Sequence, residues 1–152
     1  MKIRVINMKI RVINGPNLNM LGIREPEIYG HETYEDLLRF IQESACALGV
    51  EAQCLQSNYE GELVTFIQQC LGSADAIIIN PAAYTHTSVA ILDALKAVGL
   101  PAVEVHLSDV NAREEFRRVS YAGMACVKTI AGHGFEGYRM AMKALVDNFS
   151  VR

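Results

Sequence analysis

Three clusters of polar residues have the side chains that a catalytic site needs, and each follows or ends a short apolar run. The clusters are residues 14–17, 80–88 and 104–108. If the apolar runs are strands of one open parallel sheet, their carboxyl ends share an edge, so polar groups distant in sequence converge there. The sequence therefore predicts an active site at that edge.

Arg24 and Tyr29 have the chemistry of a base and its activator. They lie in a long connection flanked by Gly22 and Gly30, which is typical of a lid. A free tyrosine titrates near ~10, and a neighbouring guanidinium lowers that value because it stabilises the phenolate. The plainer alternative is a surface ion pair and an aromatic side chain that only packs.

Glu104 and His106 have the chemistry of a general acid with its supporting group. Two residues apart in a strand, they project to one face, so the carboxylate can orient the imidazole. The alternative is a core histidine with a satisfied hydrogen bond. The strand ends here, and the backbone N–H groups of Leu107 and Ser108 can bind a carboxylate.

Further ligands are expected in two segments. The first holds donors and acceptors ahead of a helix, and a cap by one threonine would explain only one of them: Asn80, Thr85, His86, Thr87, Ser88. The second is a short charged helix with Arg113, Arg117 and Arg118. At least two of these arginines are expected on a solvated face, and one facing the pocket would recognise an anion or a polyol.

The elements that position these residues alternate along the chain. Strands are expected over 9–13, 50–55, 75–79, 101–105 and 125–130. Helices are expected over 34–48, 60–71, 87–98, 112–118 and 135–149, the first after a Thr33–Asp36 capping box. This alternation predicts an α/β fold: a flavodoxin-like three-layer sandwich with a five-stranded parallel sheet in the order 2-1-3-4-5.

Composition narrows the function classes. The 152 residues are 51% hydrophobic, which suits one domain, and the net charge of −3 without a Lys/Arg run argues against nucleic-acid or membrane partners. Four scattered cysteines are expected to be small core residues and encode no zinc or redox motif. Without an apolar signal segment, the cytoplasm is the expected location.

Residues 1–7 repeat as 8–14, so we expect residues 1–7 to be dispensable and 8–152 to form the catalytic domain.

Three other functions fit less well. The glycine pattern of 132–137 resembles a dinucleotide-binding turn, but too little chain follows it, and close packing of the last helix explains it better. A phosphate-accepting receiver domain needs acidic residues where Asn14 and Asn80 stand, and an FMN protein needs a Ser/Thr-rich loop after the first strand. Schiff-base dehydration needs a lysine, and Lys96 and Lys128 lie outside the clusters.

At these motifs the chain closely resembles the type II 3-dehydroquinate dehydratases, or type II dehydroquinases. The resemblance covers nearly the whole chain from Met8 and is carried by four signatures in order: Asn14-Gly15-Pro16-Asn17-Leu18-Asn19, Gly22-x-Arg24-Glu25-Pro26-x-x-Tyr29-Gly30, Asn80-Pro81 with Thr85-His86-Thr87-Ser88, and Glu104-Val105-His106-Leu107-Ser108. It implies anti elimination of water from 3-dehydroquinate to 3-dehydroshikimate through an enolate, without metal or cofactor, in the shikimate or quinate pathway.

The resemblance also implies a role for each site residue. Tyr29 would remove the C2 proton, Arg24 would lower its pKa, His106 would protonate the departing hydroxyl and Asn17 would hold a water at the enolate oxygen. The implied substrate ligands are Asn80, His86, Arg117 and the backbone of Leu107 and Ser108, with Glu104 and Arg113 in support. Asp93 would reach a neighbouring subunit's site in a dodecamer of trimers.

Overall fold

A parallel sheet of five strands lies at the centre of the computed structural model, which describes residues 7–23 and 26–150, except the side chains of residues 28, 29, 149 and 150. The order is β2-β1-β3-β4-β5, as predicted. The strands are β1 (Lys9–Asn14), β2 (Glu51–Gln56), β3 (Ala76–Asn80), β4 (Ala102–His106) and β5 (Lys128–Ala131). In this register Asn14 pairs with Asn80, so two polar residues meet where β1 and β3 end.

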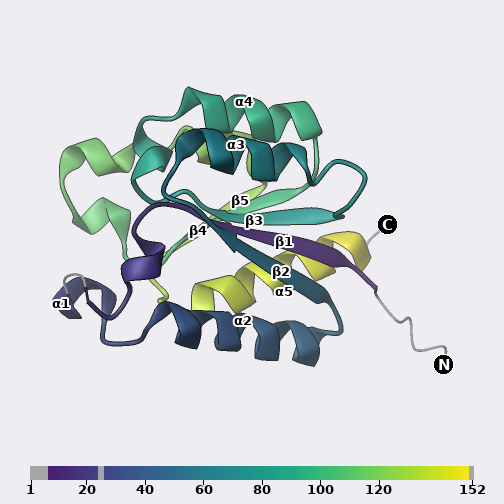
Figure 1. Ribbon diagram of the computed structural model, residues 1–152, viewed down its shortest axis with the longest axis horizontal. Helices are drawn as coiled ribbons and strands as arrows, with labels where there is room; N and C mark the ends of the chain where they lie inside the picture. The colour runs from purple at the N-terminus through teal and green to yellow at the C-terminus, as the bar shows by residue number, and fades with distance from the viewer. Residues whose placement is uncertain (1–6, 24–25, 151–152) are drawn as a thin grey trace.

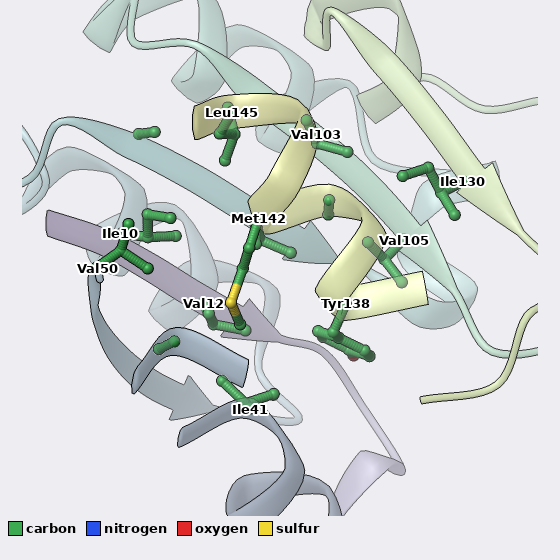
Figure 2. Close-up of a cluster of buried hydrophobic side chains, with 14 of the residues drawn as sticks. Ile10, Val12, Ile41, Val50, Val103, Val105, Ile130, Tyr138, Met142 and Leu145 are labelled. Atoms are coloured by element: carbon green, nitrogen blue, oxygen red, sulfur yellow. The ribbon is translucent and has the colours of Figure 1, made fainter. Parts of the chain in front are cut away.

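Helices cover both faces of the sheet, which confirms the predicted three layers (Figure 1). One face carries α2 (Tyr34–Leu48) and α5 (Glu136–Ser150), and the other carries α3 (Glu60–Gln68) and α4 (Val89–Val98). Figure 2 shows the first of the two cores, where Val12 and Val105 of the sheet pack with Ile41 of α2 and Met142 of α5. Because both faces of the sheet are covered at its centre, β3 is buried along its whole length, whereas the edge strand β2 is polar and partly exposed.

The helix ends follow local chemistry. Thr33 and Asp36 form the predicted capping box at the start of α2, and Gly49 ends that helix in the left-handed conformation with φ 71°. Gly99 ends α4 in the same way. The start of α4 differs from the prediction, because Ser88 is its N-cap and accepts a hydrogen bond from the Ile91 N–H. The preceding residues form a 3-10 helix, η2 (Ala82–His86).

Four other segments correct the sequence prediction. The helix α3 ends at Gln68, because Cys70 and Leu71 make tighter i to i−3 bonds. The long connection flanked by Gly22 and Gly30 contains the short helix α1 (Pro26–Tyr29), and the 3-10 turn η1 (Leu18–Met20) precedes it. Two 3-10 turns, η3 (Val110–Ala112) and η4 (Glu115–Arg118), replace the charged helix, because Arg113 between them is extended. The turn η5 (Ala122–Ala125) delays β5 to Lys128.

The cysteines follow the prediction only in part. Cys70 is buried and Cys54 and Cys126 are half-buried, but Cys46 is exposed, so its assignment to the core was wrong. Close packing of α5 is confirmed at Gly137, where an added Cβ would lie 3.3 Å from Val105 Cγ1. Within the described residues, no helix is long and apolar enough to span a lipid bilayer.

Candidate active site

A cavity of about 670 Å³, including the space at its open mouth, lies at the carboxyl edge of the sheet. The structure brings eight of the predicted site residues together around it: Asn17, Asn80, His86, His106, Leu107, Ser108, Arg113 and Arg117. These residues come from the segments after β1, β3 and β4, which confirms that the three polar clusters converge. The edge predicted from the strand ends is therefore the candidate active site.

Asn17 reaches the cavity on a tight turn after β1. An added Cβ at Gly15 would lie 2.5 Å from the Pro81 carbonyl oxygen, so the turn packs directly against the end of β3. Asn17 itself is left-handed, with φ 70°, a conformation that asparagine tolerates better than most residues. Its N–H donates to Asn58 Oδ1 over 3.0 Å, which holds the turn from the side of β2.

Asn80 belongs to a chain of hydrogen bonds that we call the amide–tyrosine network, made of Tyr34, Asn14, Tyr138 and Asn80. Asn80 Nδ2 donates to the Tyr138 hydroxyl over 3.0 Å, and that hydroxyl donates to Asn14 Oδ1 over 2.7 Å. Asn14 Nδ2 lies 3.4 Å from the Tyr34 hydroxyl. The network ties α2 and α5 to the ends of β1 and β3. The buried amides of Asn14 and Asn80 therefore have hydrogen-bond partners within the protein.

Glu104 is a buried carboxylate that contacts His106, as predicted. Its side chain is 0% exposed, and Oε1 lies 2.5 Å from His106 Nε2. Oε1 also accepts 2.7 Å hydrogen bonds from the hydroxyls of Thr85 and Ser120, and Oε2 accepts one of 3.0 Å from Thr129. Burial acts to raise the pKa of Glu104, but the hydrogen bond and charge of His106, with the bonds from Ser120 and Thr85, outweigh it and lower the pKa to about 2.

The charge on Glu104 fixes which nitrogen of His106 is free. An ionised carboxylate only accepts hydrogen bonds, so Nε2 must carry a hydrogen and donate it to Glu104. Nδ1 is then the ring nitrogen that can exchange a proton with a molecule in the cavity. The pair thus has the arrangement of a general acid with an orienting carboxylate, as the sequence predicts.

His86 is held as a neutral ring that can accept a hydrogen bond. Its Nδ1 lies 2.7 Å from the Val119 carbonyl oxygen, which can only accept, so Nδ1 carries the hydrogen. Burial lowers the pKa of His86; the bond to Val119 opposes this, while the positive charges of His106 and Arg117 add to it. Nε2 of His86 is therefore free to accept a hydrogen bond from a ligand hydroxyl.

Two arginines line the cavity, where the sequence led us to expect one. Arg113 and Arg117 both belong to the lining, and only Arg118 is exposed outside it. The prediction that at least two of the three arginines lie on a solvated face was therefore wrong. Arg117 Nε donates to Glu114 Oε2 over 2.8 Å. Because this bond uses Nε, the two terminal nitrogens remain oriented for an anion.

Three predicted residues are not placed at the cavity. Arg24 lies outside the described residues, and for Tyr29 only the backbone is described, at the end of α1. Asp93 is exposed on α4 and does not line the cavity of its own chain. Their roles in the site therefore stay predictions.

Sequence reasoning missed two groups of residues. The first is the apolar part of the lining: Pro16, Leu18, Met20, Leu21, Ala82, Ala83 and Val110. The second comprises the hydroxyls that hold Glu104 and Asn80, from Ser120, Thr129 and Tyr138. A buried charge or amide must have hydrogen-bond partners, and this was the signal available for the second group. That requirement does not say where in the sequence the partners lie.

Comparison with known proteins decides the family. Residues 8–146 match the family model described as dehydroquinase class II. The chain belongs to the class II dehydroquinase family. This confirms the resemblance that the four signatures carry, since all four lie within the matched residues.

Several relatives match over nearly their full length. The "3-dehydroquinate dehydratase" of Clostridium acetobutylicum is 52% identical over 143 residues, which cover 94% of this chain and 99% of the relative. The crystal structure of the type II dehydroquinase from Butyrivibrio crossotus aligns with a TM-score of 0.90 and 50% identity, covering 92% of this chain and 98% of that one. The crystal structure of the type II dehydroquinase from Propionibacterium acnes aligns with a TM-score of 0.88 and 40% identity. That alignment covers 93% of this chain and 99% of the other.

Proposed function

We propose that this chain is a 3-dehydroquinate dehydratase, a hydro-lyase that removes water from 3-dehydroquinate to give 3-dehydroshikimate. Family membership supports the reaction, and the observation that carries its chemistry is the Glu104–His106 pair at a cavity lined by Asn17, Asn80 and Arg117. A polyhydroxylated carboxylate needs hydroxyl ligands, an anion site and a proton donor for its leaving group. The lining residues have this chemistry.

The acid step uses His106. In its protonated form Nδ1 donates a proton to the hydroxyl that leaves C1, while Nε2 stays bound to the charged Glu104. The C–O bond then breaks with water as the leaving molecule, so no hydroxide has to be released. Glu104 stabilises the imidazolium before transfer and holds the neutral ring in one tautomer after it.

The base in this proposal is Tyr29, with Arg24 beside it. A phenolate formed next to a guanidinium removes the C2 proton on the opposite face from His106, which makes the elimination anti. A proton next to a ketone is much less acidic than a phenol, so the base is insufficient unless the developing enolate is also stabilised. Asn17, through a bound water, supplies that stabilisation, and its left-handed backbone directs it to the edge of the cavity.

The remaining ligands orient the substrate. Asn80 and the Nε2 atom of His86 bind its hydroxyls, and Arg117 with the backbone N–H groups of Leu107 and Ser108 takes its carboxylate. Arg113 supports this anion site from the same wall of the cavity. The reaction written this way needs neither a metal nor a cofactor.

We extend the proposal to assembly and context. The chains form a dodecamer of trimers in which Asp93, exposed on α4, reaches the site of a neighbouring subunit. The enzyme works in the cytoplasm, in the shikimate pathway or in quinate catabolism. Residues 8–152 form the catalytic unit, and a chain without residues 1–7 should keep full activity.

The test is direct. Mixing the protein with 3-dehydroquinate in EDTA should produce the ultraviolet band of the conjugated product. Borohydride added during turnover should not inactivate the enzyme, because no lysine is among the described residues that line the cavity. Absence of the band would contradict the proposed reaction, and inactivation by borohydride would contradict its mechanism.

A further inference from the structure

The amide–tyrosine network lies directly behind one wall of the cavity. Asn80 is its only member that lines the cavity among the described residues. Asn14 and Asn80 are paired in the sheet register, and the Tyr138 hydroxyl reaches both from α5. Tyr138 is 0% exposed and packs in the core shown in Figure 2. A phenol hydroxyl at this depth must find partners inside the protein.

The partners of Asn80 favour one direction for each hydrogen bond that its amide makes. The Tyr138 hydroxyl has one hydrogen, which it donates to Asn14 Oδ1, so it can only accept from Asn80. On its other side, Asn80 Oδ1 accepts the Ala82 N–H over 3.1 Å. Turning the Asn80 amide over would place its NH₂ group against the Ala82 N–H and its oxygen against a hydroxyl with no hydrogen left. One orientation of the amide is therefore favoured from both sides.

We propose that Tyr138 is a positioning residue for substrate binding, which holds the Asn80 amide in the one orientation that matches a substrate hydroxyl. This inference rests on the proposed function. In the fixed orientation, Asn80 presents its second Nδ2 hydrogen and the second lone pair of Oδ1. A hydroxyl group both donates and accepts, so it can use both.

The hydroxyl of Tyr138 can be removed without emptying the core. Tyr138→Phe keeps the ring in the core that also contains Met142 and Val12, and it deletes only the atom that contacts the two amides. The Asn80 amide then loses one of the two bonds that set its orientation. We expect substrate affinity to fall, whereas the acid step at His106 should keep its geometry, because Glu104 and its hydroxyl partners lie outside this network.

The experiment measures KM and kcat for 3-dehydroquinate in the full chain and in Tyr138→Phe. We expect KM to rise about tenfold, with kcat within about twofold of its original value. Tyr34→Phe is the matched control. It removes the hydroxyl at the far end of the same network, which lies 3.4 Å from Asn14 Nδ2 and makes no hydrogen bond to Asn80, so KM should not change. A merely structural role would lower the thermal stability of both variants and leave both KM values unchanged.

A double mutant shows whether Tyr138 acts through Asn80. In an Asn80→Ala background, Tyr138→Phe should raise KM no further. If Tyr138→Phe does not fold, Asn14→Ala tests the same link, because it frees the Tyr138 hydrogen to turn toward Asn80 and should also raise KM. An unchanged KM in the folded variant, or additive effects in the double mutant, would overturn this inference alone. A wild-type chain that does not convert 3-dehydroquinate would overturn the proposed function as well.

Discussion

His106 Nε2 lies 2.5 Å from Glu104 Oε1, and this contact ties the proposed acid to a buried charge. The same carboxylate receives hydroxyl hydrogen bonds from the segments after β3 and after β4 and from β5. Because those hydroxyls stabilise the charged form, Glu104 can orient His106 without accepting its proton. Both the rate of the acid step and the acid sensitivity of the fold should therefore depend on this contact.

Glu104→Gln should lower kcat by about 100-fold with a smaller change in KM. The amide keeps the size of the side chain but removes the charge that stabilises the imidazolium and fixes its tautomer. The measurement is steady-state kinetics with 3-dehydroquinate. A variant that unfolds would also lose activity. The circular dichroism spectrum of Glu104→Gln must therefore match that of the wild type before the kinetics are compared. A kcat within about twofold of the wild type would contradict the assignment.

Glu104 should also make the fold sensitive to acid. Its pKa in the folded chain is about 2, below the ordinary value of 4.5. Its stabilisation is therefore complete above pH 4.5 and is lost as the pH falls toward 2. Between pH 6 and pH 3 the free energy of unfolding should fall by about 2 kcal/mol more in the wild type than in Glu104→Gln. Denaturant titration of both proteins measures this difference, and identical losses would show that Glu104 does not contribute.

Gly15→Ala should impair the site through the turn that carries Asn17. The added Cβ would lie 2.5 Å from the Pro81 carbonyl oxygen, so the turn must move away from the end of β3. We expect kcat/KM to fall by about 100-fold, because small displacements of a catalytic group are costly. Gly61→Ala in α3 is the control, since nothing lies within 4 Å of its added Cβ and its activity should not change. Full activity of Gly15→Ala would show that the turn does not need this close approach.

Tyr29→Phe tests the proposed base. Removing the phenolic hydroxyl should lower kcat by about 1,000-fold with little change in KM, the pattern of a group that acts in the transition state. Tyr59→Phe is the matched control, since Tyr59 is 73% exposed and lies outside the cavity lining. A large rise in KM at unchanged kcat would instead assign Tyr29 to binding.

The sequence predicted the parts of this molecule that depend on short spacing. Alternation of strand and helix gave the sheet order, and the two-residue spacing of Glu104 and His106 placed them on one face. The capping box of Thr33 and Asp36 could be predicted because its two partners lie within one helical turn. These features follow from local geometry, which the chain carries in its order of residues.

The partners of buried polar groups could not be predicted in this way. Tyr138 contacts Asn14 across 124 residues, and Ser120 contacts Glu104 across 16, so neither pair shows a local pattern. The charged segment after β4 was assigned to a helix from its composition, but tertiary contacts direct it otherwise. Val119 accepts from His86, and the Tyr121 N–H donates to the Thr85 carbonyl. These bonds bring Arg113 and Arg117 to the cavity wall in place of a solvated helix face.

The exposure of Cys46 offers a practical route to labelled protein. Burial raises the pKa of the Cys54, Cys70 and Cys126 thiols, which leaves them little thiolate at neutral pH. Cys46 is exposed near the end of α2, whereas the start of that helix contacts the amide–tyrosine network. A maleimide fluorophore would therefore attach at one place, far from the reaction, where its signal could follow subunit association without disturbing turnover.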